Sequence, residues 1–154
     1  MRSRVLITGL LVLAVVLSGC LNNSSYVNCG QIMPNDPAEE KTAEMLCFQN
    51  RFLGCNPGLL AIQTVSSDYT WQTNYEINQV GFSEEKCAVQ QQFFVSEGSL
   101  KEKLDGKTIT CTYSQGLAFN DFVYQKMSDR QFIETNCEGN AKEGVLSILD
   151  SIGA

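Results

Sequence analysis

The stretch Tyr69–Val80, YTWQTNYEINQV, alternates apolar or β-branched side chains with polar ones. Successive side chains of an extended chain point to opposite sides. One side therefore carries Trp71, Thr73, Tyr75 and Ile77, and the other carries Gln72, Asn74, Glu76 and Asn78. Such alternation is typical of an antiparallel sheet with one buried face and one solvated face. We therefore predict a strand here, with one buried face and one solvated face.

Three more segments carry strand patterns, at residues 59–65, 87–95 and 107–113. Residues rich in Gly, Asn, Asp and Ser separate these segments from their neighbours, as turns require. Residues 87–95 have one exception to their pattern, because Gln91 falls on the same side as Cys87, Val89, Phe93 and Val95. Together with the strand at residues 69–80, these segments predict four antiparallel strands.

Helix patterns flank the four strands. The sequence Asp36-Pro37-Ala38-Glu39 has the residues that start a helix, and Gly54 is a natural stop, so we predict a helix that ends at Leu53. Near the other end, helices are predicted over residues 128–136 and from Asn140 onward. The predicted fold class is therefore α+β, with an N-terminal helix packed on a four-stranded antiparallel sheet and followed by C-terminal helices.

A helix wrapped by four antiparallel strands resembles the layout of cystatin-like folds. Cystatins insert a hairpin with the motif Q-x-V-x-G into cysteine proteases. This chain has Gln79-Val80-Gly81 at the end of the strand predicted over residues 69–80, which departs from that spacing. The resemblance therefore implies an architecture and carries no protease-binding role to this chain.

The first twenty residues have the three parts of an export signal. Arg2 and Arg4 precede the uncharged run Val5–Leu17, which is shorter than the roughly 20 residues that a membrane-spanning helix needs. The run ends in Leu17-Ser18-Gly19-Cys20, which resembles the lipobox of prokaryotic lipoproteins. This resemblance implies cleavage before Cys20 and a diacylglycerol or related lipid on the sulfur of Cys20.

The lipobox sets the predicted domain organisation. Residues 1–19 are a signal peptide, residues 20–35 are the lipidated cysteine and a polar tether, and residues 36–154 are a single disulfide-stapled α+β domain. A diacyl group supplies the two chains that stable membrane anchoring requires. We therefore expect a lipid-anchored protein on the extracytoplasmic face of the cell membrane or of the outer envelope.

The cysteine count agrees with export. The chain has seven cysteines, and lipidation of Cys20 leaves six: Cys29, Cys47, Cys55, Cys87, Cys111 and Cys137. An even number in an exported chain predicts three disulfides. There is no histidine and no C-x-x-C spacing, so no metal or other cofactor is predicted.

We predict pairing of Cys87 with Cys111, because both lie on the apolar side of neighbouring strands. Cys29 and Cys137 flank the domain and are predicted to close it. This scheme leaves Cys47 with Cys55, which would be about 12 Å apart on a continuous helix and too far to bridge. Either the helix breaks before Cys55 or the pairing is wrong.

The charge balance restricts the partners. Without residues 1–19 the chain has nine Lys and Arg against seventeen Asp and Glu, a net charge of −8. Nucleic-acid binders concentrate basic residues on one face, so nucleic acid is excluded as a partner. The partners that remain possible are the membrane, which the protein contacts through its lipid, and an envelope protein or a small ligand.

Two function classes stay open. The first is a non-catalytic binding or envelope interaction module, with a contact surface formed by Leu117, Phe119, Phe122 and Tyr124. The alternative for these residues is that they close the open end of the core. The second class is an envelope enzyme that uses carboxylates, such as Glu40 and Glu44, which share a helix face and are typical of a solvated surface. No residue is predicted to be catalytic.

The first prediction concerns Cys20. Replacing Cys20 by Ala removes the sulfur that would carry the lipid, so the variant should leave the membrane fraction and partition into the aqueous phase of a detergent separation. Identical aqueous partitioning of the wild type and the variant would show that Cys20 bears no anchor.

Overall fold

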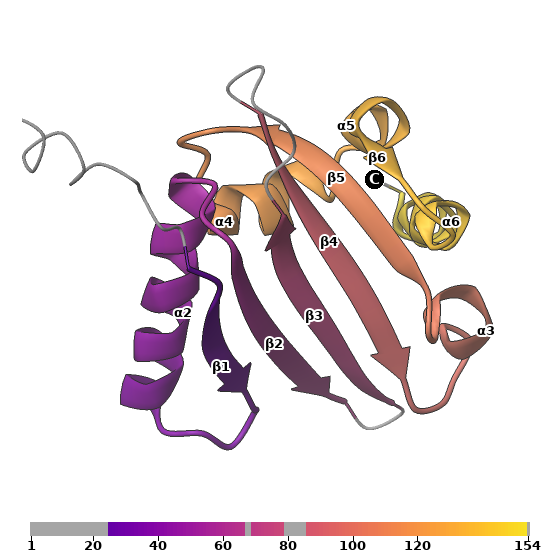
Figure 1. Ribbon diagram of the computed structural model, residues 1–154. Helices are drawn as coiled ribbons and strands as arrows, with labels where there is room; N and C mark the ends of the chain where they lie inside the picture. Colours follow the sequence, from indigo (N-terminus) through magenta and orange to yellow (C-terminus); the bar gives the residue numbers. More distant parts are fainter. Residues whose placement is uncertain (1–24, 67–68, 79–85, 154) are drawn as a thin grey trace, which may run out of the picture.

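The computed structural model describes residues 25–66, 69–78 and 86–153 (Figure 1), so Cys20 and the lipobox lie outside the described residues. The fold is α+β around one sheet whose strands follow the order β1-β2-β3-β4-β5-β6. The strands are β1 Val27–Ile32, β2 Gly58–Val65, β3 Thr70–Asn78, β4 Lys86–Val95, β5 Thr108–Ser114 and β6 Cys137–Glu138. β1 pairs with β2 in parallel, and every later pair is antiparallel.

The predicted four-stranded antiparallel sheet is therefore wrong, because the sheet has six strands and is mixed. The four predicted strands correspond to β2, β3, β4 and β5. β1 lies within the segment predicted as a tether, and its pattern is broken by a shift of register between Asn28 and Gln31. Gly30, within that shift, has a φ of +104°, which favours glycine. β6 has only two residues, too few to produce a pattern.

In the part of the chain that the structure describes, one helix precedes β2 in the sequence, and the others follow β4. They are α2 Ala38–Leu53, α3 Lys101–Leu104, α4 Phe119–Asp121, the π-helix η2 Phe122–Lys126, α5 Arg130–Asn136 and α6 Lys142–Ile152. α2 connects the parallel strands β1 and β2, a connection that needs a crossover of this length. In Figure 1, α2 runs beside β1, while α5 and α6 lie beyond β5 at the opposite edge.

Three helix starts differ from the sequence prediction, and at α6, which begins at Lys142, the N-cap position is held by Ala141 and not by Asn140. The carboxylate of Asp36 does not cap α2, because it accepts the backbone N–H of Met33, and Pro37 occupies the N-cap position. At α5 the cap is Asp129, whose carboxylate accepts the N–H of Phe132 at 3.2 Å. The helices still begin close to the predicted positions, since the apolar pattern places them and the cap adjusts only the first turn.

One face of the sheet, here called the inner face, carries the core. Phe52 of α2 is fully buried at its centre and stacks on Tyr113 of β5, with 3.9 Å between ring centroids. The Tyr113 hydroxyl donates to the carbonyl oxygen of Phe52 at 3.0 Å. Phe119 and Phe122 pack against the same ring at 5.2 and 5.4 Å. Burial of one such ring contributes about 1.5–3 kcal/mol, so this cluster is a large part of what holds α2, α4 and η2 on the sheet.

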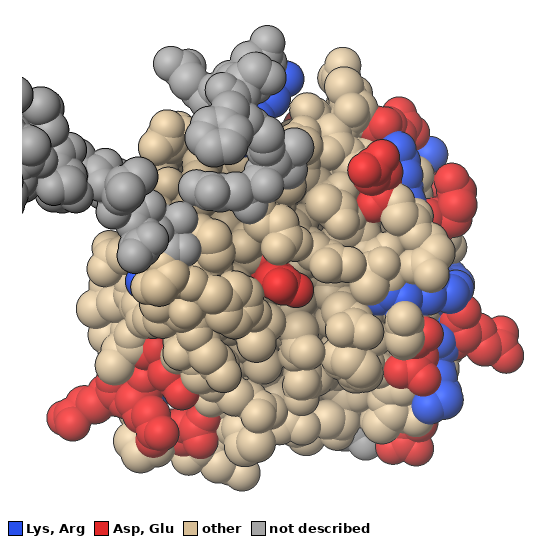
Figure 2. Space-filling view, in the orientation of Figure 1, with Lys and Arg blue, Asp and Glu red and all other residues tan. Residues whose placement is uncertain are grey.

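The opposite face of the sheet is polar. It carries the side chains that alternate with the inner ones, among them Gln63, Gln72, Asn74, Gln90, Gln92, Thr108, Thr110 and Thr112. Figure 2 shows that charged groups are sparse over the strands and gather at the margins, with acidic groups beside α2. The first turn of α2 contributes Glu39 and Glu40 to that acidic region.

Three disulfides are present, as the cysteine count predicts, but all three predicted pairings are wrong. The bonds join Cys29 to Cys47, Cys55 to Cys87 and Cys111 to Cys137. The reason lies in the register of β4 and β5. Cys87 pairs with Tyr113 and Cys111 pairs with Val89, so the two cysteines are offset along the strands.

The other bonds follow from elements that the sequence pattern did not reveal. β1 brings Cys29 to Cys47 of α2, with 5.6 Å between their Cα atoms. β6 places Cys137 directly opposite Cys111, at a Cα separation of 4.0 Å. Cys55 lies just beyond α2 with a φ of +53°, and its Cα atom is 5.3 Å from that of Cys87. α2 therefore ends before Cys55, and this cysteine bonds to Cys87 and not to Cys47.

The second prediction is this connectivity. Cleavage after lysine and arginine places each of the six cysteines on its own peptide, because Lys41, Arg51, Lys86, Lys101, Lys107, Lys126, Arg130 and Lys142 separate them. Non-reducing peptide mapping should recover three linked pairs, Cys29–Cys47, Cys55–Cys87 and Cys111–Cys137, with no free thiol among the six. The same digest after reduction is the control, and a linked Cys87–Cys111 pair would contradict the register of β4 and β5.

Candidate functional site

A cavity of about 190 Å³ lies against the inner face of the sheet. Its floor is formed by two residues of β3, Trp71 and Tyr75, and two residues of β4, Gln91 and Phe93. Tyr75 and Gln91 are direct cross-strand partners, and the rings of Trp71 and Phe93 meet edge to face with centroids 6.0 Å apart. The strand predicted at residues 69–80 therefore supplies one side of this floor.

The roof and ends of the cavity come from the C-terminal half of the chain. α6 contributes Val145, Ile148 and Leu149, whose spacing of i, i+3 and i+4 puts them on one side of the helix. Leu104 of α3, Val123 of η2 and Met127 complete the lining. The cavity thus depends on where α6 lies relative to the sheet.

Close contact with α3 fixes one side of α6. A Cβ atom at Gly144 would lie 2.5 Å from the carbonyl oxygen of Lys103, so the two helices can approach this closely because residue 144 has no side chain. The ammonium of Lys103 donates to the hydroxyl of Ser147 at 2.9 Å. These contacts seat α6 beside the loop between β4 and β5.

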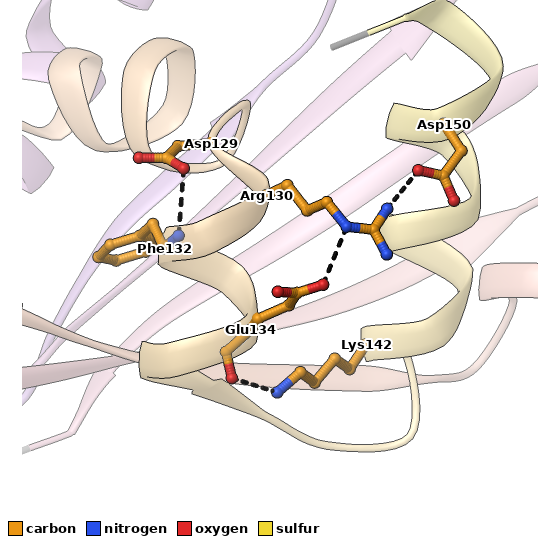
Figure 3. A network of polar contacts seen from close by, with 6 residues as sticks. All are labelled: Asp129, Arg130, Phe132, Glu134, Lys142 and Asp150. Carbon is orange, nitrogen blue, oxygen red and sulfur yellow. Dashed lines mark hydrogen bonds and ion pairs between the residues drawn. The ribbon is translucent and has the colours of Figure 1, made fainter.

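Polar contacts with α5 fix the other side (Figure 3). Arg130 bridges the carboxylates of Glu134, at 2.9 Å, and Asp150 of α6. The ammonium of Lys142, the first residue of α6, donates to the backbone carbonyls of Glu134 and Cys137 at 2.8 and 2.9 Å. Exposed ion pairs contribute only about 0–1 kcal/mol each, so this network mainly orients α6.

Two polar side chains are buried among the described residues, and both belong to the floor region. Thr73 and Gln91 are each 3% exposed. The indole N–H of Trp71 donates to the hydroxyl oxygen of Thr73, which also has a hydrogen bond with the Tyr75 hydroxyl. Burial raises the pKa of Tyr75 to about 12, so its phenol is neutral at physiological pH. The hydroxyls of the floor are therefore paired with each other.

Gln91 is paired more weakly. Its side-chain amide donates to the thioether sulfur of Met127 at 3.3 Å, and no other hydrogen bond to this amide is formed within the described part of the chain. A thioether is a weak acceptor, and an amide can make hydrogen bonds through both its oxygen and its nitrogen. The amide oxygen therefore accepts no hydrogen bond from the described residues, but it is not fully enclosed, because the fully buried unpaired side-chain oxygen among these residues belongs to Glu44.

The cavity lining contains no Asp, Glu, Lys or Arg. Glu40 and Glu44 lie on α2, outside the lining, and a carboxylate oxygen of Glu44 approaches the bulge of β1 so closely that a Cβ atom at Gly30 would be 2.4 Å from it. Across residues 25–66, 69–78 and 86–153, no group of three Cys, Asp or Glu side chains is placed to hold a metal ion. What this cavity offers chemically is apolar contact and one amide.

The predicted contact residues do not form one exposed surface. Phe119 and Phe122 are 1% and 0% exposed and belong to the aromatic core, Leu117 is half-buried, and Tyr124 is 76% exposed. Phe119 and Phe122 are three residues apart in the helical turns of α4 and η2, which brings them to the same side. For these two residues, the alternative of closing the core is the one that the structure supports.

The sequence analysis missed the cavity, although one of its observations pointed there. Gln91 was the polar residue on an otherwise apolar strand face, and buried polar groups are more informative than exposed apolar ones. The lining residues of α6 belong to the last predicted helix, and the sequence gives no indication that a space remains beneath them.

Comparison with family models, curated proteins and solved structures finds no match for this chain. The cystatin-like layout gains no support, since the sheet has six strands and Gln79-Val80-Gly81 lies outside the described residues. Among the described residues, no helix is long and apolar enough to cross a membrane.

The third prediction tests the core role of the two phenylalanines. Phe119→Ala and Phe122→Ala should each lower the free energy of unfolding by about 3–5 kcal/mol, because each removes a fully buried ring and leaves a cavity. Tyr124→Ala is the matched control, and its effect should stay within about 0.5 kcal/mol because its ring is exposed. Urea unfolding of the oxidised protein measures all three, and equal stability of the Phe119 and Tyr124 variants would contradict the packing.

Proposed function

We propose that this protein is a lipid-anchored, extracytoplasmic binding module that takes a small ligand in the cavity beneath α6 and catalyses no reaction. The observation that carries the proposal is the cavity itself, which is apolar and uncharged and has an incompletely paired amide in its floor. Cavities with an apolar lining and a few inward polar groups are the usual form of small-molecule sites.

The tether part of the proposal comes from the lipobox-like sequence at Cys20. An extended chain spans at most about 3.3–3.6 Å per residue, so the seven steps from Cys20 to the start of β1 at Val27 reach about 25 Å. With the lipid in the bilayer, the domain would stay within about one domain diameter of the membrane surface. Such a short reach favours ligands and partners found at the membrane or in the adjoining envelope.

The catalytic alternative needs carboxylates that converge on a cleft. None lines this cavity, and its only titratable side chain is Tyr75, held neutral by its raised pKa. General acid–base catalysis needs a group that exchanges protons near the working pH. The lining therefore supports binding in preference to carboxylate catalysis at this site.

The fourth prediction uses Trp71, the only tryptophan of the chain, which lies in the cavity floor. Its fluorescence should respond to toluene, a small apolar probe, in a saturable way. Val145→Phe adds bulk to the α6 side of the cavity and should abolish the response by filling the space. Ile152→Phe is the matched control on the same helix, where residue 152 is 69% exposed and outside the lining, and it should respond like the wild type.

The melting temperature of each variant separates a filled cavity from a disturbed fold. Forcing extra volume into a packed core costs about 1–3 kcal/mol, so a Val145→Phe protein that melts within a few degrees of the wild type has accommodated the ring in existing space. Absence of any saturable response in the wild type, or an equal response in both variants, would reject the cavity as the binding site.

A further inference from the structure

We infer that the cavity selects neutral, ring-sized ligands that carry a carboxamide or a comparable group able both to donate and to accept a hydrogen bond, and that Gln91 is the residue that recognises this group. The inference rests on the proposed function, because it names the class of ligand for the same site. It is carried by three observations: the size of the cavity, the state of the Gln91 amide and the absence of charge in the lining.

The size of the cavity sets the size of the ligand. An engineered cavity of about 150 Å³ in another protein holds benzene. The present cavity, at about 190 Å³, has room for one aromatic ring and a substituent of a few atoms. The aromatic rings of Trp71 and Phe93 in the floor and the aliphatic side chains of α6 above them give such a ring contact on both sides.

The Gln91 amide determines which polar group the ligand should carry. This side chain is 3% exposed, and within the described residues only its N–H group forms a hydrogen bond, while its oxygen accepts none. Its present partner is the Met127 thioether, a weak acceptor, and a ligand carbonyl would replace this partner with a strong one. The second half of the amide could accept an N–H from the same ligand group, and a carboxamide presents both functions side by side.

Met127 gives the site a movable boundary. It follows η2, and its side chain is half-buried and reaches both Gln91 and the sulfur of Cys111, which is 3.9 Å from its own sulfur. Methionine is unbranched and adapts its shape with little cost. When a ligand takes over the Gln91 amide, the Met127 side chain can shift without any movement of the strands.

The uncharged lining sets the selectivity against ions. No Lys or Arg lines the cavity to neutralise a carboxylate, and no Asp or Glu lines it to neutralise an amine. Moving an ionised carboxylate into such surroundings costs far more than one neutral hydrogen bond returns. An anionic ligand of the same shape should therefore be rejected.

The experiment compares three probes that differ only in the substituent of one ring: toluene, benzamide and benzoate. Affinities are read from Trp71 fluorescence at neutral pH, with the full chain in detergent. The wild type should bind benzamide about five- to tenfold more tightly than toluene, the effect of one net hydrogen bond, and benzoate at least about a hundredfold more weakly than benzamide.

Two variants at neighbouring positions of β4 isolate the residue. Gln91→Leu replaces the buried amide with an apolar side chain of similar size, and it should bind toluene at least as well as the wild type while losing the preference for benzamide. Gln90→Leu makes the same change on the opposite face of the sheet and should keep the wild-type order of affinities.

The outcomes separate this inference from the proposed function. The cavity site is supported if toluene binds the wild type and Val145→Phe abolishes that binding. If, in addition, benzoate binds as tightly as benzamide, or Gln91→Leu keeps the preference for benzamide, then the proposed ligand class is wrong although the cavity site stands. If none of the three probes binds the wild type, the proposed function and the inference fail together.

Discussion

The aromatic cluster around Phe52 is the interaction on which the rest of the structure depends. A sheet with one apolar face must cover that face, and in this chain short segments from distant parts of the sequence share the task. Phe52 brings α2 onto the sheet, Tyr113 presents a strand residue to it, and Phe119 and Phe122 bring α4 and η2 against the same ring. Helices of three to seven residues, such as α4 and α5, are not stable alone, so tertiary packing is what maintains them.

The three disulfides reinforce this arrangement by joining elements that are distant in the sequence. Cys29–Cys47 joins the edge strand β1 to α2, and Cys55–Cys87 joins the end of α2 to β4. Cys111–Cys137 holds the two-residue strand β6, from which the chain continues into α6. Each bond contributes about 2–4 kcal/mol, a large share of the stability of a domain of this size.

The cavity follows from how the inner face is divided among its covering elements. The Phe52 cluster covers one region, and α6 covers the β3–β4 region without filling it. Its position is set by the close contact at Gly144 and by the contacts of Arg130 and Lys142 with their neighbours. Those contacts are made by residues outside the cavity lining, so they do not depend on what occupies the space beneath α6. Such preorganisation lowers the cost of binding a small molecule.

The sequence by itself determined the elements whose information is local. Alternation over residues 69–80 identified β3 as a half-buried strand, apolar spacing identified α2 and α6, and the number of cysteines gave three disulfides. Only the tertiary structure decided the register that sets Cys87 opposite Tyr113, and with it the pairing of the cysteines. It also decided that β1 pairs with β2 at one edge of the sheet and that the side chain of Gln91 lines a cavity. These features depend on contacts between segments that are distant in the sequence. A local pattern along the chain indicates which side of a strand or helix a residue faces, but it does not indicate which residues it contacts there.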